Sequence, residues 1–202
     1  NEKNDSQNSI IMVGALLNIG NINNIEGNFI ANKIINDKGG YCGNAGSSIA
    51  NQGTIKSIKG DFLYNITEIT GPSNANGTLY NEGSIGSVKG DFIGNKINSQ
   101  TNMVLGGAIS NQGNITNLQS NFIENNIKSN TGNALGGAIY NNKDATIANI
   151  TGDFIGNTAT SSSNYARGGA IYNAGTIGEI HGSFINNYTS GQGETFGGVI
   201  FN

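Results

Sequence analysis

Apolar side chains return along the chain at fixed positions of a unit close to thirty residues long. Successive phenylalanines are separated by 33, 30, 30, 32 and 30 residues. They are Phe29, Phe62, Phe92, Phe122, Phe154 and Phe184. Ahead of each phenylalanine stand two aliphatic residues three positions apart, such as Ile177 and Ile180, and a further aliphatic residue precedes that pair. A fixed internal period is typical of stacked repeats, so we expect one domain over residues 1–202.

Two columns of asparagine follow the same period. The first lies two residues after the leading aliphatic position, at Asn18, Asn51, Asn81, Asn111, Asn141 and Asn173. The second lies three residues after each phenylalanine, at Asn32, Asn65, Asn95, Asn125, Asn157 and Asn187. Identical amides stacked one above another bond as a ladder, so we expect both columns, like the phenylalanines, to be structural.

The apolar spacing is that of short strands. No long window repeats at i, i+3, i+4 and i+7, as a helix would require. Short runs of Ile, Val, Phe and Tyr are instead bounded by Gly, Asn and Ser, which favour turns. Each unit holds about three such runs, for example Ala-Ile-Tyr-Asn, Thr-Ile-x-x-Ile and Asp-Phe-Ile-x-Asn. This predicts an all-β, right-handed parallel β-helix (solenoid) of six full coils plus a partial one, with equivalent residues ~4.8 Å apart.

Between the repeating runs lie segments whose sequence does not repeat. They are rich in Asn, Ser, Thr and Gly, and they cover 33–45, 66–76, 96–105, 126–135, 158–167 and 188–196. We interpret them as loops that project from one edge of the coil. Loops on one face of a solenoid are a common place for partner recognition.

A second surface feature follows the leading aliphatic column. The next residue should point to the opposite side of the strand, and aromatic side chains occupy that position at Tyr80, Tyr140, Tyr172 and Phe201. If the aliphatic residue faces inward, these rings form an outward stripe that suits a glycan or a protein. The alternative is that a neighbouring segment covers them.

Two short motifs alternate along the chain and resemble a known family. The first is Gly-Gly-Ala-Ile, at 106–109, 136–139 and 168–171, and the second is Phe-x-x-Asn, in all six units. This pairing resembles the chlamydial polymorphic membrane proteins and similar autotransporter passenger domains of Gram-negative bacteria. The resemblance implies a right-handed β-helix displayed at the bacterial outer membrane, often acting in adhesion. The repeat here is more regular than is usual in that family.

Composition excludes several classes of function. Lys and Arg total 10 of 202 residues and the net charge is −3, which leaves no basic face for a nucleic-acid backbone. The single cysteine, Cys42, cannot form an intrachain disulfide, and we interpret it as a loop thiol. No apolar run reaches the ~20 residues of a membrane-spanning helix. We expect no nucleic acid, no cofactor, and a membrane only through a segment outside this chain.

One acidic column raises the question of catalysis. Asp61, Asp91 and Asp153 precede the phenylalanine of their units, and neighbouring coils would bring Asp61 and Asp91 within ~5 Å, the carboxyl separation of a retaining glycosidase. The other units place Asn28, Asn121 and Ser183 there. All three residue types cap turns by bonding to the local backbone, so we favour that role and leave a cation site as an alternative.

The remaining charged candidates are isolated. His181 is the only histidine, and its column otherwise holds varied polar residues, as an exposed position would. A catalytic triad or a histidine metal site needs further ligands. Arg167 is the only arginine, and we expect a solvated charge in a loop.

The sequence therefore predicts a non-enzymatic, extracellular, adhesin-like passenger module that binds a host surface protein or glycan. One alternative is a self-assembling filament subunit, because neither end carries an evident cap and open strand edges favour stacking with further copies. The second alternative is a polysaccharide lyase or hydrolase, by analogy with other β-helices.

Overall fold

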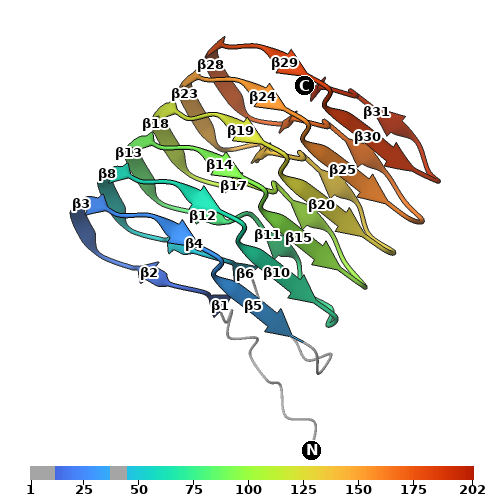
Figure 1. The fold of residues 1–202 in the computed structure, drawn as a ribbon, viewed down its shortest axis with the longest axis horizontal. Helices are drawn as coiled ribbons and strands as arrows, with labels where there is room; N and C mark the ends of the chain where they lie inside the picture. The colour runs from blue at the N-terminus through green and yellow to red at the C-terminus, as the bar shows by residue number, and fades with distance from the viewer. Residues whose placement is uncertain (1–11, 37–44) are drawn as a thin grey trace, which may run out of the picture.

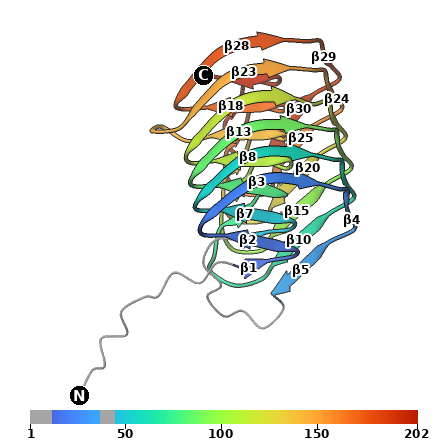
Figure 2. The same cartoon turned by 90° about the vertical axis from the view of Figure 1, so that its left-hand side faces the viewer.

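The chain forms a parallel β-solenoid. The computed structural model describes residues 12–36 and 45–202, which contain 32 strands arranged in five parallel sheets and no helix. Each coil visits the five sheets in turn, and the next coil lies directly beside it (Figure 1). Seen from the side, equivalent strands rise as the rungs of a ladder (Figure 2). The predicted all-β parallel solenoid is confirmed.

Three sheets contain the runs that the sequence marks as strands. Sheet 2 comprises β2 (Leu16–Asn18), β7 (Ile49–Asn51), β12 (Leu79–Asn81), β17 (Ile109–Asn111), β22 (Ile139–Asn141), β27 (Ile171–Asn173) and β32 (Ile200–Phe201). Sheet 3 comprises β3 (Asn21–Glu26), β8 (Thr54–Lys59), β13 (Ser84–Lys89), β18 (Asn114–Gln119), β23 (Thr146–Thr151) and β28 (Thr176–His181). Sheet 4 comprises β4 (Phe29–Ile30), β9 (Phe62–Leu63), β14 (Phe92–Ile93), β19 (Phe122–Ile123), β24 (Phe154–Ile155) and β29 (Phe184–Ile185).

Apart from β1 (Met12–Val13), the strands of the other two sheets lie in or at the edge of the segments predicted as loops, so that prediction is wrong. Sheet 5 comprises β5 (Lys33–Asn36), β10 (Ile66–Ile69), β15 (Lys96–Ser99), β20 (Asn126–Ser129), β25 (Thr158–Ser161) and β30 (Tyr188–Gly191). Sheet 1 comprises β1 (Met12–Val13), β6 (Ala45–Gly46), β11 (Ala75–Asn76), β16 (Val104–Leu105), β21 (Ala134–Leu135), β26 (Ala166–Arg167) and β31 (Thr195–Phe196). These segments bury a core cluster of their own that includes Ile97, Val104 and Ile127, which is why they form strands.

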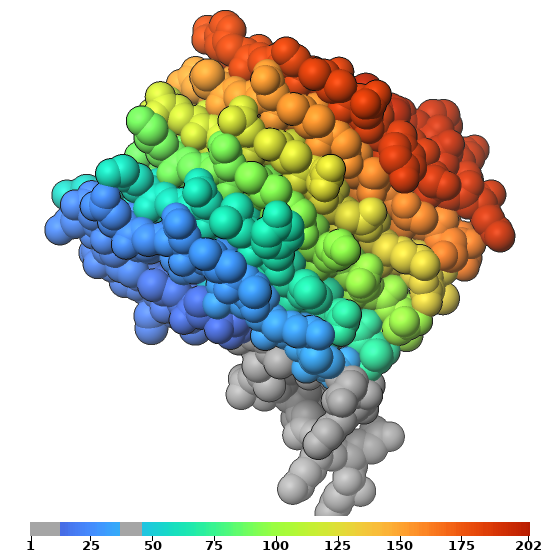
Figure 3. All heavy atoms as spheres, viewed as in Figure 1, coloured from blue at the N-terminus to red at the C-terminus, as the bar shows by residue number. Residues whose placement is uncertain are grey.

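The main core is a column of like side chains. Every phenylalanine of the repeat pairs in register with the next, and the ring centroids of neighbours lie 4.4–5.4 Å apart. The aliphatic columns of sheets 2 and 3 surround this stack. Figure 3 shows the coils as closely packed parallel bands. The predicted stacking of equivalent residues is confirmed.

Both asparagine columns form buried amide ladders. In the first, each Nδ2 donates to the Oδ1 of the next coil at 2.6–2.9 Å, from Asn18 through to Asn202. In the second, Asn32 to Asn187 repeat this bond at 2.8–2.9 Å. Apart from Asn32 and Asn202 at the two ends, each amide also bonds a backbone group, as when Asn125 Nδ2 donates to the carbonyl of Phe92 at 2.9 Å. Buried amides are thereby satisfied, as burial requires.

The first glycine of each Gly-Gly-Ala-Ile motif turns the chain between sheets 1 and 2. Gly106, Gly136 and Gly168 have φ of 65°, 73° and 66°, a conformation that glycine adopts without strain. A Cβ at Gly136 would lie 2.0 Å from the carbonyl oxygen of Ile139. The motif is therefore a corner that only glycine fits.

Candidate functional site

Aromatic side chains form a ladder on the outer face of sheet 2, in the last coils. Tyr140 and Tyr172 stack with ring centroids 5.4 Å apart, and Tyr172 stacks on Phe201 at 5.1 Å. All three side chains are half-buried, so part of each remains accessible. Burial, and secondly the proximity of Tyr172, raises the pKa of the Tyr140 hydroxyl, which donates to Asn142 Oδ1 at 3.1 Å.

The only arginine joins this ladder. Arg167 ends β26 in sheet 1, and its guanidinium carbon lies 5.0 Å from the ring centroid of Phe201, 4.9 Å from that of Tyr165 and 5.6 Å from that of Phe196. Each distance is within cation–π range. The expectation of a solvated loop charge is therefore wrong. The structure adds two contacts that the sequence did not reveal. Arg167 of sheet 1 lies over Phe201 of sheet 2, and it pairs with Phe196 of the next coil within sheet 1.

We call these residues the aromatic–arginine stripe; they are Tyr140, Tyr165, Arg167, Tyr172, Phe196 and Phe201. Its rim is open, since Phe196 is 46 % exposed and Tyr165 is 38 % exposed. The Arg167 Nε atom is buried and has no hydrogen-bond partner among the described residues. Aromatic faces bind apolar surfaces and the C–H faces of sugars, and the guanidinium can pair with an anion.

Tyr80 does not belong to the stripe, although the sequence placed it there. Its side chain is 0 % exposed, and its hydroxyl bonds the carboxylate of Glu82. Its neighbours in the column, Ala50 and Ser110, are small, and a Cβ at Gly46 in sheet 1 would lie 3.0 Å from the Tyr80 Cβ. The Tyr80 ring fills the space at the junction of sheets 1 and 2, where the neighbouring side chains are short. This burial raises the pKa of the Tyr80 hydroxyl far above the usual range.

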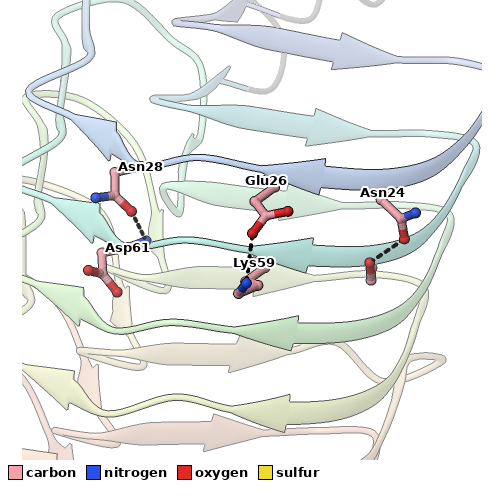
Figure 4. A network of polar contacts seen from close by, with 6 residues as sticks. Asn24, Glu26, Asn28, Lys59 and Asp61 are labelled. Carbon is pink, nitrogen blue, oxygen red and sulfur yellow. Dashed lines mark hydrogen bonds and ion pairs between the residues drawn. The ribbon is translucent and has the colours of Figure 1, made fainter.

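The aspartate column caps the backbone of the following coil. Asp61 Oδ1 accepts the backbone N–H of Asp91 at 2.9 Å, and Asp91 Oδ1 accepts that of Asn121 at 2.9 Å. Asp153 Oδ1 does the same for Ser183 at 2.7 Å. Figure 4 shows that Asn28 holds the N–H of Asp61 in the same way, beside the Glu26–Lys59 ion pair. Asparagine and aspartate serve one capping role here. The sequence predicted capping of the local turn, but the N–H that each side chain holds belongs to the next coil.

This geometry predicts how Asp91 responds to substitution. Asp91→Ala is expected to lower the free energy of unfolding by about 1 kcal/mol, because the N–H of Asn121 loses its acceptor. Asp91→Asn keeps an oxygen in place and should change stability by less than about 0.5 kcal/mol. Chemical denaturation followed by circular dichroism measures both. Equal costs for asparagine and alanine would mean that the negative charge, and not the acceptor, is what matters.

The other sequence candidates lie apart from the stripe. His181 is exposed, and its Nε2 lies 3.2 Å from the Glu179 carboxylate. Cys42 lies outside the described residues. Within residues 12–36 and 45–202, three or more His, Cys, Asp or Glu side chains nowhere gather as a metal would need.

The two ends of the solenoid expose further apolar side chains. Near the N-terminal end these are Leu17, Ile19, Ile30 and Ile35, and near the C-terminal end Ile185, Tyr188, Phe196, Val199 and Ile200. The outermost strand of each sheet has one neighbour within the described chain. Such edges offer unpaired backbone groups to another strand.

Comparison with known proteins returned no relatives: no family model, no curated protein and no solved structure matches this chain. Among the described residues, no helix is long and apolar enough to cross a membrane.

Proposed function

We propose that the protein is a non-enzymatic extracellular binding module, an adhesin-like passenger that presents the aromatic–arginine stripe to a host glycan or surface protein. The observation that carries the proposal is the stripe itself. Three stacked rings stay partly open on an outer face, next to the chain's only arginine. Aromatic residues and arginine are the side chains that contribute most to binding at interfaces.

The surface location is supported by the two repeated motifs. Gly-Gly-Ala-Ile forms the corner between sheets 1 and 2, and Phe-x-x-Asn supplies the phenylalanine stack and an amide ladder. Both motifs are thus tied to the architecture that the resemblance implies for bacterial outer-membrane passengers. We do not extend the proposal to polysaccharide cleavage, because the aspartates proposed for it already accept backbone hydrogen bonds.

The test is a binding screen with fluorescently labelled protein on a glycan array and on cultured epithelial cells. Tyr172→Ala should weaken any binding found at least about tenfold, because it removes the central ring of the ladder. Arg167→Gln should weaken it as well if the ligand is anionic.

Tyr64→Ala is the matched control. Tyr64 is 59 % exposed and lies outside the stripe, so its loss should leave binding unchanged. Circular dichroism of each variant verifies that the fold persists. Equal effects of Tyr64→Ala and Tyr172→Ala, or binding that survives Tyr172→Ala, would argue against the stripe as the binding surface.

The exposed ends favour a second candidate, a filament subunit. Head-to-tail stacking would place the column of Phe184 under that of Phe29 in the next copy and would cover both apolar ends. We rank this candidate second, because the stripe that carries the first proposal lies on an outer face and does not depend on how the solenoid begins or ends. Electron microscopy of the purified protein distinguishes the two, since a filament subunit forms rods.

A further inference from the structure

A pocket lies on the outer face of sheet 5, on strands other than those of the stripe. It is a pocket of about 360 Å³ open to solvent, a size within the usual range for small-molecule sites. Three coils contribute matching pairs of polar side chains. They are Glu68 with Thr70, Asn98 with Gln100, and Lys128 with Asn130.

Several polar groups of the pocket have no partner in the described chain. The Lys128 ammonium and the Asn98 amide make no hydrogen bond or ion pair there, and Gln100 uses only its oxygen, which accepts from Asn130. Glu68 is the sole carboxylate of the lining, and it faces Lys33 at 3.6 Å. The free groups are therefore mostly donors, and they suit a ligand rich in acceptor oxygens.

The charge of this face has the opposite sign to that of the molecule. The strands of sheet 5 carry Lys33, Lys96 and Lys128 against Glu68 alone, that is +3 − 1 = +2, whereas the whole chain carries −3. An accessible positive surface on an acidic protein attracts anions selectively. Ile35, which is 49 % exposed, adds an apolar patch to the pocket wall.

We propose that this pocket binds an acidic saccharide, of the uronate or sialate class. The sugar carboxylate pairs with the Lys128 ammonium. The ring hydroxyls bond the amides of Asn98 and Gln100 and the Glu68 carboxylate, and the C–H face of a neighbouring ring of the saccharide lies against Ile35, three strands from Lys128. This site is separate from the aromatic–arginine stripe, so it stands or falls independently of the function proposed for the stripe.

The probes are 3′-sialyllactose and tri-galacturonate, with lactose and maltotriose as neutral counterparts. Titration calorimetry of the full chain at low ionic strength should show the acidic sugars binding at least about tenfold more tightly than the neutral ones. Lys128→Gln should weaken acidic-sugar binding at least about tenfold, and Asn98→Ala should weaken it severalfold. Added salt should weaken it further, because the ion pair is solvent-exposed.

Two lysines outside the pocket are matched controls. Lys96→Gln removes a charge from the same sheet, and Lys56→Gln removes one from sheet 3; both should leave binding nearly intact. An effect of Lys96→Gln equal to that of Lys128→Gln would overturn the proposal, since it would indicate diffuse charge and no defined site. Absence of acidic-sugar binding, or neutral sugars bound as tightly, would overturn it too. If Tyr172→Ala abolished acidic-sugar binding and Lys128→Gln left it unchanged, the sugar would bind at the stripe. That result would refute this inference and leave the proposed function intact.

Discussion

Replacing Phe122 by alanine lowers the free energy of unfolding by about 3–5 kcal/mol, the cost typical of a large core truncation. The Phe122 side chain is 0 % exposed, and its ring lies between those of Phe92 at 5.4 Å and Phe154 at 4.7 Å. Alanine leaves a cavity at the centre of the stack. Backbone hydrogen bonds between the coils keep their spacing fixed, so the coils cannot move together to close that cavity. The surroundings therefore collapse only partly. Guanidinium denaturation followed by circular dichroism measures the change.

Phe184→Ala is the control for position in the column. Its ring has one stacking neighbour, Phe154 at 4.8 Å, and is only partly buried. The same chemical change should therefore cost clearly less than at Phe122. Equal losses of unfolding free energy at the two sites would contradict this explanation. They would mean that the cost comes from removing the ring itself and not from the cavity left between two neighbouring rings.

Replacing Asn125 by leucine is expected to cost at least about 3 kcal/mol, although the side chains are similar in size. The Asn125 amide donates to the Phe92 carbonyl and to Asn157 Oδ1, each at 2.9 Å, and accepts from Asn95 Nδ2 at 2.8 Å. Leucine leaves these buried groups without that partner, at about 1–3 kcal/mol for each unsatisfied group. The readout is again the midpoint and slope of denaturant unfolding.

An exposed asparagine pair provides the comparison. Asn117 Oδ1 accepts from Asn149 Nδ2 at 3.0 Å on the solvent side of sheet 3. Water replaces that bond when it is lost, so Asn117→Leu should change stability by less than about 0.5 kcal/mol. If Asn125→Leu proved as mild as Asn117→Leu, the buried ladder would be dispensable and the apolar columns alone would hold the coils together.

The columns of identical residues could be predicted because stacking makes the sequence periodic. Phe62, Phe92 and Phe122 pair in direct register, and any side chain that fits one coil fits the next. The same logic identified both amide ladders. The aspartates were expected to cap their own turns, and they hold the backbone of the next coil instead. Nearest-neighbour stacking is therefore readable from one sequence.

Sheets 1 and 5 were missed because their columns are less uniform. Five residues after each phenylalanine comes one column of sheet 5, occupied by Ile34, Thr67, Ile97, Ile127, Ala159 and Thr189. These residues differ in size and polarity, and Gly, Asn and Ser surround them, so the segments resemble loops. A β-branched or small residue recurs at the same distance from each phenylalanine, and that regularity could have predicted these strands.

The candidate site was only partly predictable, because it depends on contacts between sheets. Tyr140, Tyr172 and Phe201 follow from strand alternation, and the structure shows them stacked. Burial of Tyr80 depends on Gly46 in the adjacent sheet, and Arg167 of sheet 1 lies over Phe201 of sheet 2. No spacing rule along the chain encodes such cross-sheet neighbours.

The constant register of sheet 3 has a consequence for how such a rod changes length. Ser84 pairs with Asn114 just as Thr54 pairs with Ser84, so a cut at the same point of two neighbouring coils joins chemically equivalent ends. Unequal recombination between the corresponding stretches of coding sequence would therefore add or remove one whole layer without breaking a strand. The number of coils, and with it the length of the rod, becomes an inherited variable that is independent of the chemistry of the outer surfaces.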